Sequence, residues 1–315
     1  MTARTGLDLR VGFIGLGRMG GPMAKRLIAG GAAVTLFDQR PEAVERVVAE
    51  AGGGRAASPG AVAAGSDVVI TMLPDGRAVR AVVLGADGGE SGILAALPAG
   101  AVLIDMSSSA PTGTQALGRV LAERGIAMLD APVSGGVARA QSGTLAVMVG
   151  GDPAVVTRCR PLLALIGHQI FETGPLGSGH ALKALNNLVS AAGLVAAAEA
   201  LLIGRRFGLD PQRMIDVFNA SSARNNSTEN KFAQHVFSRS FASGFALDLM
   251  VKDLGIALDL ARDTDTPAPL SAACRSLWAS AQGALDAGAD HTAIVQWMEM
   301  VAGTRLGTGT TDEHR

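Results

Sequence analysis

The sequence of 315 residues predicts an α/β domain followed by an all-α domain. In the first half, short apolar runs alternate with helical patterns, which is typical of a parallel sheet covered by helices on both faces. A glycine-rich turn follows the first of these runs. After Gly177 the strand patterns stop, and helical periodicity continues to about Ala302.

Each element can be placed by its apolar pattern and its flanking turn residues. The expected strands of the first domain are Arg10–Ile14, Ala33–Phe37, Val68–Met72, Ala101–Ile104, Ala127–Leu129, Leu145–Val149 and Gln169–Phe171. The expected helices of the second are about Ala181–Phe207, Pro211–Asn219, Glu229–Phe237, Leu247–Asp263 and Leu270–Ala287. We place the domains at 1–173 and 174–305, with a long inter-domain helix at about 179–207 and a flexible tail at 306–315.

The composition is that of a soluble globular protein, with 48% hydrophobic and 17% charged residues and a formal net charge of −1. This balance gives no argument for binding nucleic acid or a membrane surface. Met1–Arg10 has no apolar signal core, and charged residues such as Glu199 interrupt the most apolar stretch, so we expect a cytoplasmic protein without a membrane span. The two cysteines lie far apart and the five histidines are scattered, so we expect no metal site.

The glycine-rich turn fits the pattern G-x-G-x-x-G between an apolar strand and a helix. The residues expected to bind a dinucleotide there are Gly15, Leu16, Gly17, Arg18, Met19 and Gly20. The context of strand, turn, helix and second strand predicts a Rossmann-type domain, although a simple tight βα turn or, for Met19, packing would explain the same residues.

Asp38 ends the second predicted strand, at the distance where such domains carry an acid for the ribose. A carboxylate there disfavours a 2′-phosphate and therefore favours NAD, whereas a strand-end cap is the structural alternative. Gln39 and Arg40 follow it in the same part of the cofactor site, and Arg40 leaves NADP possible. Leu73, Pro74 and Ser108 follow the third and fourth strands, where open sheets bind ligands, so we expect cofactor contacts or ordinary turns there.

Two further stretches suggest a substrate site. Ser134, Gly135 and Gly136 follow the fifth strand and could present backbone N–H groups to a carboxylate, or form an ordinary loop. Lys183, Asn186 and Asn187 share one side of an otherwise apolar helix. We therefore predict a catalytic lysine facing the cleft between the domains. The alternative is a surface lysine, although the helix dipole disfavours a cation near a helix start.

Four motifs carry a family resemblance, and they lie at Gly12–Ala24, Asp130–Leu145, Gly177–Asn187 and Gly244–Leu258. In that order they resemble the β-hydroxyacid dehydrogenase family, which includes 3-hydroxyisobutyrate dehydrogenases and tartronate semialdehyde reductases. The resemblance implies that Ser134, Gly135 and Gly136 bind the substrate carboxylate and that Lys183 is the general acid/base. It further implies that Asn187 positions the substrate, that Lys252 reaches the cofactor, and that Asn186 belongs to the 3-hydroxyisobutyrate type.

The predicted function is therefore NAD-dependent interconversion of a short β-hydroxy acid and its semialdehyde or keto acid, by a homodimer or homotetramer. A lysine has an ordinary pKa of about 10.4, so catalysis near neutral pH requires desolvation or a neighbouring cation to lower it.

Three different functions compete with this one. An oxidative decarboxylase of the 6-phosphogluconate type resembles Lys-x-x-His-Asn, where this chain has Lys-x-x-Asn-Asn. An imine reductase and a non-catalytic nucleotide-binding protein would also carry a nucleotide-binding domain of this kind. For the doublet Lys252-Asp253, a solvated ion pair on an amphipathic helix is the structural explanation.

Overall fold

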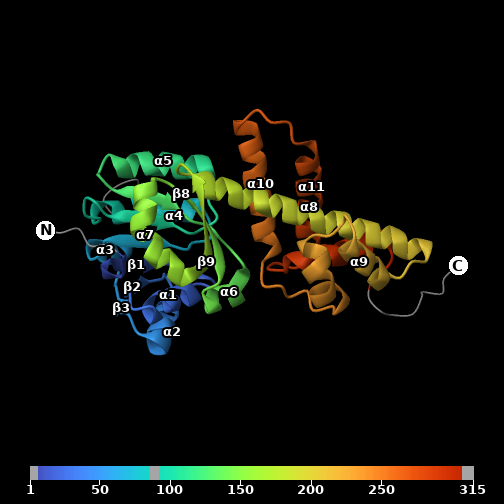
Figure 1. Ribbon diagram of the computed structural model, residues 1–315, viewed down its shortest axis with the longest axis horizontal. Helices are drawn as coiled ribbons and strands as arrows, with labels where there is room; N and C mark the ends of the chain where they lie inside the picture. The colour runs from blue at the N-terminus through green and yellow to red at the C-terminus, as the bar shows by residue number, and fades with distance from the viewer. Residues whose placement is uncertain (1–5, 86–91, 307–315) are drawn as a thin grey trace. The chain divides into compact units, whose positions relative to one another are not determined.

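The computed structural model describes residues 6–85 and 92–306. The chain divides into two compact units, Met1–Lys183 and Ala184–Arg315, and the helix α8 (Ser178–Phe207) continues through the division (Figure 1). An α/β unit is followed by an all-helical one, which confirms the predicted fold class. Of the predicted tail at 306–315, only Leu306 is described, and it is buried.

Unit 1 contains one mixed sheet, whose strands β1 to β6 are parallel. The strands are β1 (Arg10–Ile14), β2 (Ala33–Phe37), β3 (Gly54–Arg55), β4 (Val68–Thr71), β5 (Val102–Asp105), β6 (Ala127–Asp130), β7 (Val133–Ser134), β8 (Leu145–Gly150) and β9 (Gly167–Gly174). Their spatial order is β3-β2-β1-β4-β5-β6-β8-β7, with β9 paired to β8.

The expectation of a fully parallel sheet is wrong at β8, which is antiparallel to both β6 and β7. A buried strand gives the same continuous apolar run in either direction, so the sequence pattern carries no information on direction. The direction is set by the short β7, which turns the chain back so that Val133 pairs with Val147. The strands β3 and β7 were not predicted, because two residues are too few to produce an apolar run.

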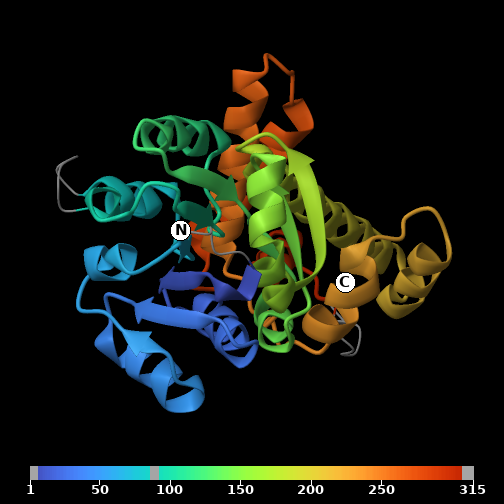
Figure 2. The ribbon, with the colours of Figure 1, turned by 60° about the vertical axis from the view of Figure 1, so that its left-hand side comes forward.

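Helices cover both faces of this sheet, as predicted. The helices of unit 1 before α8 are α1 (Gly20–Ala29), α2 (Pro41–Ala51), α3 (Pro59–Ala64), α4 (Gly76–Leu84), α5 (Pro111–Ala122), α6 (Gly136–Ser142) and α7 (Pro153–Ile166), with 3₁₀ turns at Gly6–Asp8 and Ile93–Ala95. Phe13 packs with residues of α1, α2 and α7, whereas its neighbour Ile14 packs with residues of α3, α4 and α5. Consecutive strand residues therefore enter two separate apolar layers. Figure 2 shows the ribbon of the sheet with the helices around it.

Unit 2 is built from helices in the part of the chain that the structure describes. After α8 it contains α9 (Pro211–Ala220), η3 (Ser227–Phe237), α10 (Leu247–Asp263), α11 (Pro269–Ala284), η4 (His291–Ala293) and α12 (Ile294–Ala302). Its core surrounds the fully buried Trp278 and Phe232. The predicted helix at Glu229–Phe237 is an 11-residue π-helix that begins at Ser227. Long π-helices are rare, and shorter π-bulges are frequent at functional sites.

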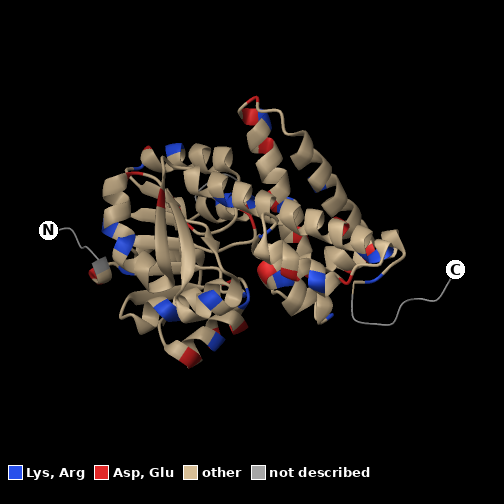
Figure 3. Cartoon of the chain, turned by 45° about the vertical axis from the view of Figure 1, so that its right-hand side comes forward, with Lys and Arg blue, Asp and Glu red and all other residues tan. Residues whose placement is uncertain are grey.

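Positive and negative residues are mixed on both units. Lys and Arg are interspersed with Asp and Glu (Figure 3). Over an 18-residue window α8 has a mean hydropathy of 1.7, so by length and composition alone it could span a membrane, contrary to our expectation. Half of that window is buried inside the protein, and core helices of soluble proteins meet the same criterion.

A buried polar cluster in unit 2 joins the start of η4 to the segment before α10. The carboxylate of Asp290 accepts hydrogen bonds from the Ser243 hydroxyl and from the backbone N–H groups of Gly244 and Phe245. The imidazole of His291 stacks on Trp278, with ring centroids 6.4 Å apart and an interplanar angle of 12°. Burial lowers the pKa of His291 to about 4, and the neighbouring Lys231 ammonium adds to the effect.

We expect the stability of unit 2 to depend on pH through His291. The folded pKa of about 4 lies below the ordinary 6.5, so between these values the unfolded chain binds a proton that the folded chain does not. Lowering the pH from 7 to 5 should therefore reduce the free energy of unfolding by about 2 kcal/mol. Urea denaturation followed by tryptophan fluorescence measures this, because both tryptophans, Trp278 and Trp297, belong to unit 2.

His291→Asn is the matched control, since an amide does not titrate in this range. The variant should lose most of the difference between pH 7 and pH 5. An equal pH dependence in the variant and the wild type would show that other groups are responsible.

Candidate active site

The turn after β1 needs glycine at two positions for steric reasons. Gly15 has φ of +99°, and a Cβ there would lie 2.4 Å from the carbonyl oxygen of Met72. A Cβ on Gly20 would lie 1.9 Å from the carbonyl oxygen of Gly15. The first glycine therefore permits the tight turn beside β4, and the second lets α1 begin directly against that turn.

Gly17 differs, because a Cβ built there would meet no atom within 4 Å. A side chain at Gly17 would thus fill open space on the outer side of the loop. The helix α1 starts at Gly20, and the preceding Met19 makes no side-chain cap. The N–H of Gly21 donates to the carbonyl oxygen of Gly17 at 3.1 Å. A helix N-terminus with a bare glycine backbone fits a pyrophosphate. Arg18 is exposed, and the half-buried Met19 packs against the core of unit 1.

Asp38 lies at the tip of β2 and is bonded to the glycine loop. Its Oδ2 accepts the backbone N–H of Leu16 at 2.7 Å, and its Oδ1 accepts the N–H of Arg40 at 2.9 Å. The guanidinium Nε of Arg40 lies 3.4 Å from the same Oδ1. Asp38 thus caps its strand end and also lies beside the loop, while Gln39 and Arg40 lie around it at the surface. This arrangement fits the adenosine ribose of a dinucleotide.

The carboxyl ends of β4 and β5 are joined by side chains that were not predicted. The hydroxyl of Ser107 accepts the N–H of Leu73 at 2.9 Å. The buried Asp105 accepts hydrogen bonds from the hydroxyls of Thr71 and Ser109, at 3.0 and 2.7 Å. The signal in the sequence was a carboxylate ending an apolar strand before a run of serines. Leu73 is therefore held at this edge of the sheet, and Pro74 and Ser108 are chain neighbours of the bonded pair.

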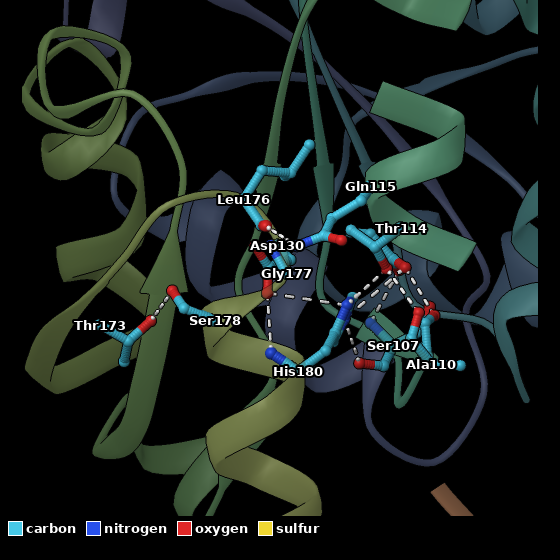
Figure 4. A network of polar contacts seen from close by, with 12 residues as sticks. Ser107, Ala110, Thr114, Gln115, Asp130, Thr173, Leu176, Gly177, Ser178 and His180 are labelled. Carbon is cyan, nitrogen blue, oxygen red and sulfur yellow. Dashed lines mark hydrogen bonds and ion pairs between the residues drawn. The ribbon is translucent and has the colours of Figure 1, made fainter. Parts of the chain in front are cut away.

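A second buried carboxylate, Asp130 at the end of β6, fixes the start of α8 (Figure 4). Its two oxygens accept the backbone N–H groups of Gly177 and His180, each at 2.7 Å. A Cβ on Gly179 would lie 2.3 Å from the carbonyl oxygen of Met148, so the first turn of α8 lies directly on the sheet. Asp130 acts as a helix cap supplied by another element.

His180 bridges the same region, with its ring fully buried (Figure 4). Its Nδ1 lies 2.8 Å from the Thr114 hydroxyl, and its Nε2 lies 3.2 Å from the carbonyl oxygen of Ser107. Both ring nitrogens are therefore used in structural contacts. Within residues 6–85 and 92–306, no group of three or more His, Cys, Asp or Glu is arranged to hold a metal.

Lys183 follows His180 by three residues on α8, and the two asparagines follow in the next turn. Asn186 donates to the Oδ1 of Asn187 at 3.2 Å, and Asn187 donates to the Oδ2 of Asp253 at 2.6 Å. The ammonium of Lys252 lies 3.6 Å from the other oxygen of Asp253. The structure thus brings the Asn-Asn and Lys-Asp motifs together.

Asp253 is 1% exposed, so the explanation of Lys252-Asp253 as a solvated pair is wrong for the carboxylate. Its role could not be predicted, because a charged doublet on an amphipathic helix gives no sign of burial. A buried carboxylate that accepts one amide hydrogen fixes the orientation of Asn187. The carbonyl oxygen of that amide then lies toward Asn186.

The Ser134-Gly135-Gly136 turn connects β7 to α6. Ser134 pairs with Ala146, and the two glycines have φ values of +136° and +72°. Both values lie in the left-handed region that other residues rarely adopt. A Cβ on Gly136 would meet nothing within 4 Å, so this face of the turn is open.

A Rossmann unit with a glycine-rich turn after β1, followed by a helical unit, is the architecture of one class of nicotinamide-dependent oxidoreductases. Residues 10–174 match the family described as the NAD binding domain of 6-phosphogluconate dehydrogenase. Residues 177–298 match the family described as NAD-binding of NADP-dependent 3-hydroxyisobutyrate dehydrogenase. The chain belongs to the β-hydroxyacid dehydrogenase family.

Individual relatives support the same assignment. The chain is 38% identical to 2-(hydroxymethyl)glutarate dehydrogenase of Eubacterium barkeri, over 96% of this chain and 99% of the relative. It is 39% identical to 3-hydroxyisobutyrate dehydrogenase of Pseudomonas aeruginosa, over 85% and 90%. The solved structure of Mycobacterium tuberculosis 3-hydroxyisobutyrate dehydrogenase with L-serine has a TM-score of 0.82 at 33% identity, covering 92% of this chain and 99% of that one. The protein is an NAD(P)-dependent oxidoreductase acting on the CH–OH group of β-hydroxy acids.

The Asp130 cap should matter more for stability than an exposed cap of the same kind. Asp130→Asn replaces one acceptor oxygen with an NH₂ group, which faces a buried N–H and leaves it unsatisfied. We expect a loss of about 2 kcal/mol in the free energy of unfolding. Hydrogen exchange at Gly177 and His180, with urea denaturation followed by circular dichroism, measures the effect.

Asp152→Asn is the matched control. The exposed Asp152 also accepts two N–H groups, from Ala154 and Val155 at the start of α7. Asn is an equally good cap, so this variant should change stability by about 0.3 kcal/mol or less. Equal losses in the two variants would contradict the special role of the buried carboxylate.

Proposed function

We propose that Lys183 is the general acid/base of the reaction and that Asn187 positions the substrate beside it. The observation that carries this proposal is the shared face of α8. Asn187 follows Lys183 by four residues, about one helical turn, and its amide is held by the buried Asp253. An ammonium and an oriented amide on one face suit a hydroxyl that becomes a carbonyl.

In the oxidation, Lys183 takes the proton of the substrate hydroxyl as the C–H bond of the same carbon breaks. When bound, the nicotinamide accepts that hydride. In the reduction, the Lys183 ammonium returns the proton to the carbonyl oxygen and stabilises the negative charge that develops there. Asn186, bonded to Asn187, belongs to the same set of substrate-binding residues.

We assign the substrate carboxylate to Ser134, Gly135 and Gly136. The two left-handed glycines and the open face at Gly136 support this assignment, because backbone N–H groups beside a hydroxyl bind carboxylates well.

NAD is the proposed preferred cofactor, with NADP as the alternative. The support is Asp38, whose carboxylate lies beside the glycine loop and would repel a 2′-phosphate. Lys252, fixed near Asp253, is the proposed contact from unit 2 to the cofactor.

The preferred substrate is a short β-hydroxy acid, with a 3-hydroxyisobutyrate-like compound as the first candidate. The relatives act, by their names, on 3-hydroxyisobutyrate and 2-(hydroxymethyl)glutarate, which both carry a hydroxymethyl or equivalent group next to a carboxylate-bearing carbon. Tartronate semialdehyde reduction and imine reduction are the alternatives. We propose a soluble cytoplasmic location, as for a metabolic enzyme.

The Lys183 assignment predicts loss of turnover without loss of cofactor. Lys183→Ala should fold and bind NADH normally, but kcat should fall on the order of 10²- to 10⁴-fold, as expected for removal of a general acid/base. The assay follows reduced-nicotinamide absorbance with 3-hydroxyisobutyrate, L-serine and other β-hydroxy acids, each with NAD and NADP. Calorimetry measures NADH binding.

Lys25→Ala is the control, because Lys25 pairs with Glu50 on the surface of unit 1 and should not affect turnover. Near-normal kcat in Lys183→Ala would remove Lys183 from the mechanism. If the wild type reduced a cyclic imine with NADPH but oxidised no hydroxy acid, the proposed substrate class would be wrong.

We also propose that the chain forms a homodimer or homotetramer through an exposed stripe of α8. The exposed apolar side chains of this stripe are spaced by three, four or fourteen residues, which places them on one side of the helix. They are Leu182, Leu185, Val189, Ile203 and Phe207. The stripe extends for about 37 Å along the helix. Exposed apolar surface of this length favours an interface, and a second copy presents the same stripe.

Ile203→Glu tests this interface, because a carboxylate at a 70% exposed apolar position should disrupt packing there. We expect light scattering to report a dimer or tetramer for the wild type and a smaller mass for the variant. Glu42→Lys, an exposed change in α2 of unit 1, should leave the mass unaltered. A monomeric wild type would contradict the proposal.

A further inference from the structure

Lys231 is a charged side chain in unit 2 that the proposed mechanism does not use. It lies in the π-helix η3, next to the fully buried Phe232, and is itself half-buried. Its ammonium donates to the hydroxyl of Ser190 on α8 at 3.0 Å. Burial lowers the pKa of Lys231 to about 8, while the charge of Asp290 opposes the shift, so the ammonium stays mostly protonated at neutral pH.

The contact with Ser190 places Lys231 on the reactive face of α8. Ser190 follows Asn187 by three residues and Lys183 by seven, which is almost two turns and about 10 Å along the axis. At about 100° per residue, seven residues bring Ser190 back to nearly the same direction as Lys183. The segment before η3 also packs against α8 here, since a Cβ on Gly193 would lie 3.6 Å from the Asn225 side chain.

The charge of Lys231 lacks a direct partner of opposite sign. Among the described residues, no carboxylate oxygen lies within the 4.0 Å that defines an ion pair with Nζ. The carboxylate of Asp290, whose charge acts on Lys231, already accepts bonds from Ser243, Gly244, Phe245 and Thr292. The His291 imidazole offers no negative charge, and the Lys231 ammonium disfavours its protonation. A half-buried cation held by one hydroxyl can accept a further anion.

The other polar residues of the segment before Lys231 have structural roles. Arg224 forms an ion pair with Glu229, at 2.8 Å. The side-chain oxygen of Asn225 accepts the N–H groups of Ser227 and Thr228, and so caps the start of η3. These contacts fix the backbone that carries Lys231 and leave its ammonium as the cation beside Ser190.

We propose that Lys231 and Ser190 bind a second anionic group of the substrate. The preferred substrate is then a β-hydroxy acid with an additional carboxylate at the end of a short chain. This inference rests on the proposed function, because the distance between the reacting hydroxyl and the second anion is counted from Lys183. Lys183 and Ser190 lie about 10 Å apart along the helix axis, so we expect a short carbon chain between the reacting hydroxyl and the second anion.

A matched pair of substrates tests the second anion. 2-(Hydroxymethyl)pentanedioate and 2-(hydroxymethyl)pentanoate differ only in a terminal carboxylate or methyl group. For the wild type, we expect kcat/KM about 10-fold or more higher with the diacid. Butanedioate and hexanedioate homologues test the reach, and one chain length should be favoured over its neighbours.

Substitutions of Lys231 and Ser190 then test whether these two side chains cause the preference for the diacid. Lys231→Met should lower kcat/KM for the diacid about 10- to 100-fold, mainly through KM, as expected for a charged hydrogen bond. The monoacid should change by no more than about 3-fold, while Ser190→Ala should show a smaller loss with the diacid of about 2- to 10-fold. Lys231→Arg should retain the preference for the diacid.

Arg224→Met is the matched control, since it removes an exposed cation from the same segment and should leave the preference unchanged. Tryptophan fluorescence checks that each variant is folded. Equal losses of kcat/KM on both substrates in Lys231→Met would mean a structural role and overturn the proposal. Equal wild-type turnover of diacid and monoacid would also overturn it while leaving the proposed function intact. Turnover of neither would overturn both.

Discussion

The two hydrogen bonds from Gly177 and His180 to the carboxylate of Asp130 are the constraint on which the rest of the site depends. A helix begins with N–H groups that have no partner within it, and burial of such groups is costly unless another element accepts them. Here β6 supplies the acceptor, and Gly179 allows the first turn to lie on the sheet. The direction of α8 is thereby set at the edge where parallel strands present their ligands. Lys183 lies one turn further on, so its position follows from a bond to a strand.

From that start, α8 presents two faces with different surroundings. On one face, Leu194, Ala198 and Leu201 enter the core of unit 2. The polar residues Lys183, Asn187 and Ser190 continue this face toward the start of the helix. Val189 and Ile203 are exposed on another face. A helix that is apolar nearly all round needs burial or a partner on every apolar face. This requirement explains why α8 has the hydropathy of a membrane span and yet carries a lysine and two asparagines: the polar residues are confined to one face.

The elements of the fold could be predicted wherever an apolar period lasts for a turn or a full strand. Val68–Thr71 and Leu247–Asp263 are of this kind. The direction of β8 could not be predicted, because burial on both faces removes the alternation that relates a strand to its neighbours. The two-residue strands β3 and β7 could not be predicted, because they are too short to produce an apolar run. The site shows the same limit. Lys183 and Asn187 were proposed from their spacing on one helix, whereas Asp253 and Lys231 contact side chains of another element, Asn187 and Ser190. No spacing in the sequence records such contacts.

Lys183 and Lys231 are attached to the fold in different ways, and this difference suits the proposed roles of proton transfer and substrate recognition. Lys183 extends from α8 itself, near the start of the helix. Lys231 extends from a separate π-helix and is anchored to α8 by a single hydroxyl. Because η3 is held by its own cap at Asn225, a change at Lys231 leaves that cap in place, and Lys231 is not on the helix that carries the proposed catalytic group. A dehydrogenase built in this way can keep one proton-transfer group and change the substrate that it accepts. The position of Lys231 is therefore where we expect specificity within the family to be decided.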